Sequence, residues 1–296
     1  MGIDLTTPGG RLRYAREQAG YKTARAFYEK IGVKQPTYSG HESGTRAFDF
    51  QAAASYADQL GNCTAAWLMG GGRGAQDSVF IDPWPRPLPA RQNFTGTHAV
   101  LEPLHRRHVA DLWEAAQNAG ESFAYMPYGP FESRAALEGF IAANTSVADP
   151  VFWAVRPLTL GRAMGWLSLM NIEPKNAAIE LGHIWFGPEL QRTRAATEAM
   201  FLLLRHAAED LGYRRLVWKC NNNNEASKRA ALRLGFTPEG LLRAHMVVKS
   251  QRRDTAMFSI IEDEWPSRRD AILSWLSPEN FGTSGTAIRS LASFRG

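Results

Sequence analysis

The chain has 296 residues, of which 44% are hydrophobic and 21% charged, a balance typical of globular proteins with a sizeable core and unlike that of disordered chains. The formal net charge is +5 and the pI is ≈ 9.3, which suits anionic partners such as nucleic acid, although many proteins without such partners are as basic. The length favours two domains over one.

The two cysteines, Cys63 and Cys220, make no metal-ligand pattern, so we expect no metal cofactor. Their scarcity favours a reducing compartment. No apolar run reaches the length of a membrane span, and the N-terminus lacks the charged-then-apolar pattern of an export signal. We therefore expect a cytoplasmic protein that does not bind membranes.

Residues 9–69 are predicted to form closely spaced short helices. Gly20 closes the first helix, Thr23 caps the second, and Gly32 allows the sharp turn that precedes the third. The apolar spacing places these helices near residues 12–19, 24–31, 33–42, 53–60 and 65–69. Two helices joined by a short turn that contains glycine make a helix-turn-helix arrangement, so this part is predicted to be an all-α domain over residues 1–70.

The composition then changes sharply. A glycine-rich run over residues 70–77 predicts a flexible segment, and a proline-rich run over residues 82–89 predicts a stiffer one. We assign residues 71–90 as a linker and residues 91–277 as a second domain. The tail, residues 278–296, is rich in Gly, Ser and Thr, and we expect it to be loosely held.

The second domain has mixed periodicity. Strands are predicted near residues 98–104, 151–156, 163–171, 178–186, 214–219, 240–249 and 255–262. Helices are predicted near residues 106–118, 133–144, 192–211, 224–234 and 264–276. This order predicts an α+β fold with a mixed, mostly antiparallel sheet flanked by helices.

The predicted strand over residues 179–186 changes its apolar parity in the middle. The apolar residues Ile179 and Leu181 occupy odd-numbered positions, whereas the apolar residues Ile184 and Phe186 occupy even-numbered ones. The change therefore falls at Gly182–His183. A β-bulge would cause this and would free backbone groups of residues 184–186. A strand buried on both faces would give the same pattern, and the pattern alone does not separate the two.

The start of the predicted long helix suits an anion. Gln191 to Ala196 follow directly after a strand, and Arg192 and Arg194 add positive charge. A helix N-terminus offers unpaired N–H groups and a partial positive charge to a phosphate. A capped surface helix with solvated arginines would look the same.

Several segments together resemble the GNAT acetyltransferases, in the branch that includes the RimJ/RimL-type enzymes. The matching segments, in chain order, are Tyr128–Phe131, Glu180–His183, Leu190–Thr193, Ala196–Ala199, Trp218–Cys220, Asn224–Ser227 and Arg253–Thr255. The resemblance covers residues 85–277 and implies a six- or seven-stranded sheet split by a V-shaped opening that holds acetyl-CoA. The loop of that family follows Arg/Gln-x-x-Gly-x-Gly/Ala, and here Arg194 stands in the place of the central glycine.

The resemblance also implies a set of site residues. Glu180 and His183 are the candidate bases, acting through water, His245 is a second-rank base, and Ser227 would protonate the departing thiolate. Backbone N–H groups near Ile184 or Trp185 would stabilise the oxyanion. The residues implied to bind acetyl-CoA are Ile184, Trp185, Phe186, Gln191, Arg192, Thr193, Arg194, Ala195, Ala196, Asn224 and Ser227.

Other readings of these residues remain open. Asn224 and Ser227 also suit helix capping, which does not conflict with binding. A group of aromatic residues could line an acceptor groove or lie in the core: Tyr125, Tyr128, Phe131 and Trp166. Cys220 is expected to be a buried thiol rather than a nucleophile.

Residues 9–70 resemble the Cro/phage-repressor-like (XRE) helix-turn-helix family. The resemblance rests on the segments Leu12–Arg16, Tyr38–Arg46 and Trp67–Gly70. It implies a recognition helix over Lys34–Glu42 that enters the DNA major groove, with Gln35 and Thr37 reading base edges. Lys34, Arg46 and the helix start at Thr23 would bind phosphate. A small protein-interaction or dimerisation module is the competing interpretation.

The sequence therefore predicts an acetyl-CoA-dependent N-acetyltransferase fused to a DNA-binding head, which would act as a homodimer on paired half-sites. Its acceptor would be a primary amine, on a protein N-terminus or a small molecule. One alternative is a transcriptional regulator in which the second domain senses acetyl-CoA without catalysis. The sequence names neither the acceptor nor the operator, and does not say whether the two domains are coupled.

Overall fold

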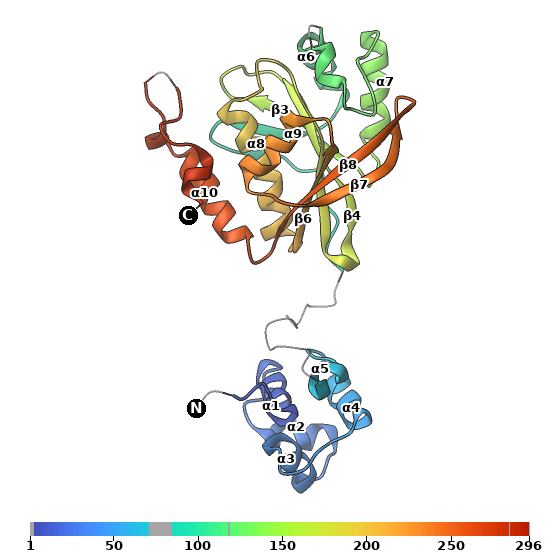
Figure 1. The fold of residues 1–296 in the computed structure, drawn as a ribbon, viewed down its shortest axis with the longest axis vertical. Coiled ribbons are helices and arrows are strands. Elements are labelled where there is room, and N and C mark those ends of the chain that lie inside the picture. The colour runs from blue at the N-terminus through green and yellow to red at the C-terminus, as the bar shows by residue number, and fades with distance from the viewer. Residues whose placement is uncertain (1–2, 71–84, 118, 284, 296) are drawn as a thin grey trace. The chain divides into compact units, whose positions relative to one another are not determined.

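The computed structural model describes residues 3–70, 85–117, 119–283 and 285–295 of the chain (Figure 1). The chain divides into two units, Met1–Pro83 and Trp84–Gly296, each of which has its own hydrophobic core. The greater part of the expected linker, residues 71–84, lies outside the described residues.

The first unit is helical. Its helices are α1 (Pro8–Gln18), α2 (Ala24–Ile31), α3 (Gln35–Ser43), α4 (Phe50–Leu60) and α5 (Ala65–Gly70). Three of them begin at a residue whose side-chain oxygen accepts a backbone N–H of the first turn, namely Thr7, Thr23 and Asp49. Three of them end at a glycine with a left-handed backbone, namely Gly32, Gly44 and Gly61. The predicted cap at Thr23 is confirmed, whereas α3 begins one residue after Lys34, which is its N-cap.

Buried polar contacts hold the helices of the first unit together. Arg16 on α1 forms an ion pair of 2.7 Å with Glu42 on α3, and both side chains are largely buried. The Tyr38 ring is fully buried beside this pair, and Arg11 donates to the carbonyl of Leu68 on α5. Removing one partner of a buried pair leaves the other charge uncompensated, so loss of Glu42 alone would destabilise this unit by several kcal/mol.

One sheet forms the centre of the second unit. Its strands are β1 (Phe94–Thr95), β2 (Ala99–Pro103), β3 (Val151–Pro157), β4 (Gly165–Glu173), β5 (Ala178–Phe186), β6 (Arg215–Asn221), β7 (Thr237–Val248) and β8 (Gln251–Ile261). Their order across the sheet is β1-β2-β3-β4-β5-β6-β8-β7, and only β5 and β6 run parallel to each other. The predicted mixed, mostly antiparallel sheet is confirmed. The described sheet has eight strands rather than six or seven, because the short β1 has no apolar alternation that a sequence pattern could detect.

Helices cover both faces of this sheet. They are α6 (Val109–Ala116), α7 (Arg134–Asn144), α8 (Arg194–Arg205), α9 (Glu225–Leu234) and α10 (Trp265–Leu276). On one face, Phe94 of β1 packs against Trp153 of β3 and against His206, which directly follows α8. On the other face, Phe140 of α7 packs against Phe152 and Trp166. Figure 1 shows α8, α9 and α10 grouped on one side, and α6 and α7 on the other.

Two helix boundaries differ from the prediction. The long helix begins at Arg194 rather than residue 192, because the Arg192 backbone is left-handed (φ 62°) and Thr193 caps the helix. It passes into a π-helical turn, His206–Asp210. The helix predicted over residues 106–118 is a short 3-10 turn, Arg106–His108, followed by α6.

A buried carboxylate joins α8 to the first strands of the sheet. Glu198 is buried, and its two oxygens accept the backbone N–H groups of Thr97, His98 and Ala99 at 2.8, 2.6 and 2.8 Å. Hydrogen bonds to an ionised group are about twice as strong as neutral ones. Glu198 therefore fixes the approach to β2 against the helix that follows β5.

The expectation of a loosely held tail is wrong for its described residues. Asn280 is buried, and its amide group bonds the carbonyls of Trp275 and Arg289 and the N–H of Arg289. The Leu291 side chain is also buried. The abundance of Gly, Ser and Thr misled the prediction because one buried amide and one apolar anchor are enough to order a short segment.

Candidate active site

Strands β5 and β6 separate after a short parallel pairing. Their ladder joins Ala178–Glu180 to Arg215–Val217 and does not continue beyond Glu180 and Val217. The resemblance implied such an opening, and the register places its closed end at Glu180.

A β-bulge lies just beyond that point. Between β4 and β5 the register shifts, so that Gly182 pairs with Ser168 and Trp185 pairs with Trp166. His183 within the bulge has a left-handed backbone, with φ 49°. The bulge interpretation of the parity change is therefore confirmed, and backbone groups at the centre of β5 are turned out of the regular ladder.

Glu180 is a buried carboxylate with a cationic partner. Its Oε2 accepts a hydrogen bond of 2.7 Å from the Asn171 amide and lies 3.0 Å from the Lys219 ammonium nitrogen. No partner for its Oε1 is present among the described residues. Glu180 lines a cavity of ≈ 230 Å³ together with polar side chains that include Asn176 and Arg215. A cavity with this lining suits ordered water, which would contact the carboxylate.

His183 is held between aromatic rings. Its imidazole stacks on Tyr128 at 5.4 Å and packs on Phe152 at 5.2 Å. Burial lowers the pKa of His183 to about 4, and the positive charge of Arg253 acts in the same direction. The imidazole is therefore neutral at neutral pH.

The aromatic residues that were candidates for an acceptor groove divide between core and surface. Trp166 is fully buried and donates its ring N–H to the Tyr128 hydroxyl at 3.0 Å. Phe131 packs against both rings. Tyr125 is 38% exposed, and its hydroxyl donates to the Asn223 carbonyl across the mouth of the opening.

Residues 184–186 follow the bulge and are supported on both sides. The Trp185 ring N–H donates to Ser122 Oγ at 2.8 Å, and its ring stacks on Phe123. The Phe186 carbonyl accepts a hydrogen bond of 2.8 Å from the Gln191 side chain. Gln191 therefore tethers the strand to the loop that precedes α8, while the half-buried Ile184 belongs to the edge of the core.

The N-terminus of α8 carries the residues predicted to bind phosphate. Thr193 accepts the N–H of Ala196, which leaves the N–H groups of Arg194 and Ala195 without a partner within the helix. The Arg192 side chain is exposed. The Arg194 guanidinium lies over the Phe281 ring of the tail, 3.3 Å from its centroid.

Asn224 and Ser227 stand at the N-terminus of α9. The Asn224 side-chain oxygen accepts the Ser227 N–H at 3.0 Å, so the capping interpretation is confirmed. Ser227 Oγ accepts the Trp218 ring N–H at 3.0 Å, and the same hydroxyl is in hydrogen-bonding contact with the Cys220 thiol. The Cys220 thiol is buried, and burial raises its pKa, as expected for an unreactive thiol.

The structure adds residues that the sequence analysis did not select. Asn171 and Lys219 contact Glu180, and Arg253 acts electrostatically on His183. Lys219 lies two residues after Val217 on β6, so both side chains are on the same face of the sheet. Because Val217 pairs with Glu180 of β5, this alternation places Lys219 near Glu180 once the two strands are known to be neighbours. His245 bonds Thr255 Oγ1 through Nδ1 at 3.1 Å and, among the described residues, makes no hydrogen bond, ion pair or ring contact with Glu180 or His183.

The residues predicted to contact DNA lie at the surface of the first unit. Lys34, Gln35 and Arg46 are exposed, and Thr37 is half-buried in the first turn of α3. Thr23 is exposed and caps α2. DNA binding by these residues stays a prediction.

Among the residues that the structure describes, no helix is both long and apolar enough to cross a membrane. In the same part of the chain, no group of three or more His, Cys, Asp or Glu side chains is arranged to hold a metal ion.

Comparison with known proteins identifies the second unit. Residues 98–237 match the acetyltransferase (GNAT) domain. A GCN5-related N-acetyltransferase from Brucella melitensis is 42% identical in sequence, with a TM-score of 0.70, and the alignment covers 72% of this chain and 97% of that one. A probable acetyltransferase of the GNAT family from Chromobacterium violaceum is 37% identical, with a TM-score of 0.61, over 66% of this chain and 98% of its own.

A relative whose name states its substrate matches a shorter part of this chain. The ribosomal-protein-serine acetyltransferase of Escherichia coli is 32% identical over 100 residues, which are 34% of this chain. The match spans 55% of that relative's length. The first unit lies outside the residues matched to the acetyltransferase domain. On these similarities, and on the sheet that parts at Glu180, the chain belongs to the GCN5-related N-acetyltransferase (GNAT) family.

Proposed function

We propose that the second unit transfers an acetyl group from acetyl-CoA to a primary amine. The observation that carries this proposal is the separation of β5 from β6 just beyond Glu180, next to a bulge and followed by the capped N-terminus of α8. This arrangement combines an opening for a thioester, a buried carboxylate and an anion-binding helix end.

The residues on the donor side fit acetyl-CoA. The N–H groups of Arg194 and Ala195, with the exposed Arg192, suit the negative charge of a pyrophosphate. The backbone of residues 184–186 would take the pantetheine arm. The arginine that replaces the family's glycine is accommodated because its side chain is directed onto Phe281.

Glu180 is the base that the geometry supports best. The attacking amine must lose a proton, and Glu180 can accept it through water in the adjoining cavity. The ion pair with Lys219 holds this carboxylate in place at the edge of the cavity. The His183 imidazole packs between Tyr128 and Phe152 rather than along that cavity, so it would line the reaction centre and not carry the proton.

The remaining chemistry would fall to the bulge and to α9. N–H groups near Ile184 or Trp185 would stabilise the negative charge on the thioester oxygen as the amine nitrogen adds to the carbonyl carbon. When the C–S bond breaks, the Ser227 hydroxyl would donate its proton to the leaving thiolate. Asn224, by fixing the first turn of α9, would hold that serine in place.

For the acceptor we favour a protein N-terminus over a large antibiotic. One relative acts on a ribosomal protein, and the cavity beside Glu180, at ≈ 230 Å³, is smaller than the roughly 300–1,000 Å³ typical of pockets for drug-sized molecules. A terminal residue or a small amine is short enough to reach it. We also propose that the first unit binds double-stranded DNA through α3, and that the protein forms homodimers for this purpose.

The transferase is tested by CoA release from acetyl-CoA with N-terminal peptides, polyamines and aminoglycosides as acceptors. We expect turnover with one class, and its loss in Glu180→Gln and Ser227→Ala with acetyl-CoA binding retained. Glu138→Gln, which changes an exposed carboxylate on α7, is the matched control. Tight binding without turnover on any acceptor would instead favour the acetyl-CoA sensor, and absence of acetyl-CoA binding would refute both.

The DNA-binding proposal needs a separate test. Operator fragments selected from random duplex DNA should bind the full chain in a salt-dependent way. Gln35→Ala should abolish the sequence preference, whereas Gln51→Ala on α4, which is also an exposed glutamine, should not. Absence of any duplex binding at low salt would favour a protein-interaction head.

A further inference from the structure

Arg253 lies on β8 beside the opening between β5 and β6. In the ladder between β6 and β8, Asn221 pairs with Thr255 and Lys219 pairs with Met257. Alternate residues of a strand share a face, so Arg253 lies on the face that carries Thr255, Met257 and Lys219. This is the face of the sheet on which Glu180 and its cavity lie.

Among the described residues, Arg253 differs from the cations around it because its guanidinium has no hydrogen-bond or ion-pair partner. Lys219 is paired with Glu180, Arg252 with Asp254, and Lys249 donates to a main-chain carbonyl. The Arg253 Nε is buried without a hydrogen-bond acceptor, and no ion pair of this guanidinium exists among the described residues. Buried donors in native proteins are almost always satisfied, so an unsatisfied one requires an explanation.

The surroundings of Arg253 belong to the reaction centre. Burial lowers the pKa of Arg253, and the charges of Cys220 and Glu180 oppose that shift. The Arg253 charge in turn lowers the pKa of His183. The unpaired guanidinium therefore lies within electrostatic range of both the bulge of β5 and the carboxylate proposed as base.

We propose that Arg253 binds a carboxylate of the acceptor, and that the acceptor is therefore an amine that also carries an acidic group. This inference rests on the proposed transferase function. A guanidinium presents a fork of donors that matches a carboxylate, and pairing satisfies the buried Nε. Polyamines and aminoglycosides carry only positive charge and would be repelled by Arg253.

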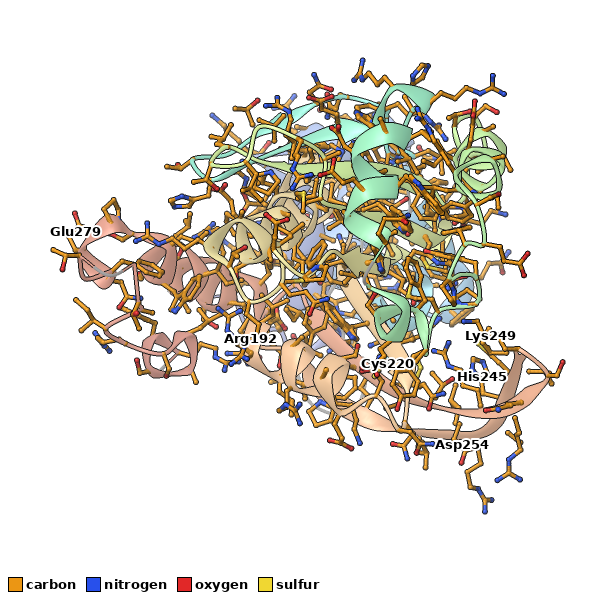
Figure 2. All side chains as sticks on the ribbon, turned by 90° about the horizontal axis from the view of Figure 1, so that it is seen from above. Arg192, Cys220, His245, Lys249, Asp254 and Glu279 are labelled. Atoms are coloured by element: carbon orange, nitrogen blue, oxygen red, sulfur yellow. The ribbon has the colours of Figure 1, made fainter. Side chains whose placement is uncertain are left out.

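The phosphates of CoA are the other anions that could reach this cleft. Their proposed site is the N-terminus of α8, which packs on the opposite face of the sheet. Figure 2 shows Arg192, in the loop before α8, well apart from Asp254 and His245 at the end of the β7–β8 hairpin. The position of Arg253 favours the acceptor carboxylate as its ligand.

The test compares acceptors that differ only in a carboxylate. The pairs are glycine with glycinamide, the amidated dipeptides Asp-Gly and Asn-Gly, and triglycine with its amide. In Arg253→Gln we expect the KM of the acidic member of the productive pair to rise about 10- to 100-fold, with kcat and the KM for acetyl-CoA little changed. Arg253→Lys should recover part of the affinity, and Arg252→Gln, which removes an exposed neighbouring arginine, should behave as wild type.

Three results would overturn the inference. An equal fall of kcat for acid and amide would assign Arg253 to the transition state, and a rise in the Kd of acetyl-CoA would assign it to the cofactor phosphates. Equal use of acid and amide by the wild type would show that no carboxylate is recognised. Circular dichroism of each variant separates these results from misfolding, and Arg253→Lys supplies the comparison if Arg253→Gln does not fold.

Binding measurements distinguish a failure of the Arg253 inference from a failure of the proposed transferase function. The same acids and amides are titrated into the complex of the full chain with CoA by calorimetry. If the wild type turns over no acceptor but binds one acid, and Arg253→Gln does not bind it, the transferase proposal fails and the Arg253 site stands. If the wild type binds none of the acids, the Arg253 site is refuted whether or not an uncharged amine is acetylated.

Discussion

The neutral imidazole of His183 makes the stability of the second unit depend on pH. Burial lowers its pKa from 6.5 to about 4. Between these two values the unfolded chain binds more protons than the native one, so the free energy of unfolding rises with pH across this window and is level above it. At about 1.36 kcal/mol per pKa unit, the lowering of the His183 pKa corresponds to roughly 3 kcal/mol of unfolding free energy.

The variant His183→Asn tests this reasoning. Asparagine does not titrate, and it tolerates the left-handed backbone of this position better than most residues do. Urea denaturation followed by tryptophan emission gives the free energy of unfolding of each protein from pH 6.5 down to about pH 4. We expect the wild type to lose about 3 kcal/mol more than the variant over this range.

The comparison concerns the pH slope and not the absolute stability, which the substitution changes by itself. Groups common to both proteins, including the carboxylates that titrate in the same window, cancel in the difference. Parallel curves for the wild type and the variant would refute a buried imidazole that resists protonation. Phe152→Leu, which removes a ring contact and keeps the histidine, is expected to retain most of the slope.

Three further predictions concern the tail and the buried carboxylate. Glu198→Gln should lower the free energy of unfolding by about 3 kcal/mol, because an amide cannot accept all three N–H groups of residues 97–99. An unchanged urea midpoint would contradict this prediction. Asn280→Ala should cost about 2 kcal/mol by leaving buried main-chain groups unpaired, measured by thermal unfolding at matched protein concentration. Phe281→Ala should weaken acetyl-CoA binding by up to about 10-fold because it releases the Arg194 side chain, whereas Phe281→Trp should preserve binding. Equal Kd values for both variants and the wild type would show that the contact between Arg194 and Phe281 plays no part in binding.

Local patterns predicted the elements around the opening well. The strand predicted at residues 178–186 has these bounds in the structure, and its change of parity marked the bulge at His183. Both are properties of consecutive side chains, which a single sequence displays directly. The start of α8 was placed two residues early because Arg192 suits a helix by propensity but has a left-handed backbone here.

Contacts between distant segments were beyond such patterns. The ion pair of Lys219 with Glu180 depends on which strands are neighbours and in what register, and neither sequence segment carries that information alone. The isolation of Arg253 is harder still, because the absence of a partner becomes visible only when every neighbouring acidic group has been placed. The order of the tail likewise depends on Asn280, one polar residue in a segment whose composition suggested the opposite.

The arginine at the family's glycine position connects these observations. A glycine at the first residue of α8 would let a phosphate approach the backbone closely, and a large side chain there would obstruct that approach unless it were directed elsewhere. In this chain the Arg194 guanidinium lies on Phe281, and Phe281 is held in place because Asn280 anchors the tail. If acetyl-CoA binds at the start of α8 as proposed, the tail would hold the Arg194 side chain away from the phosphates. It follows that truncation before residue 278 should impair acetyl-CoA binding in this chain, and that replacing Arg194 with glycine should restore that binding in the truncated protein.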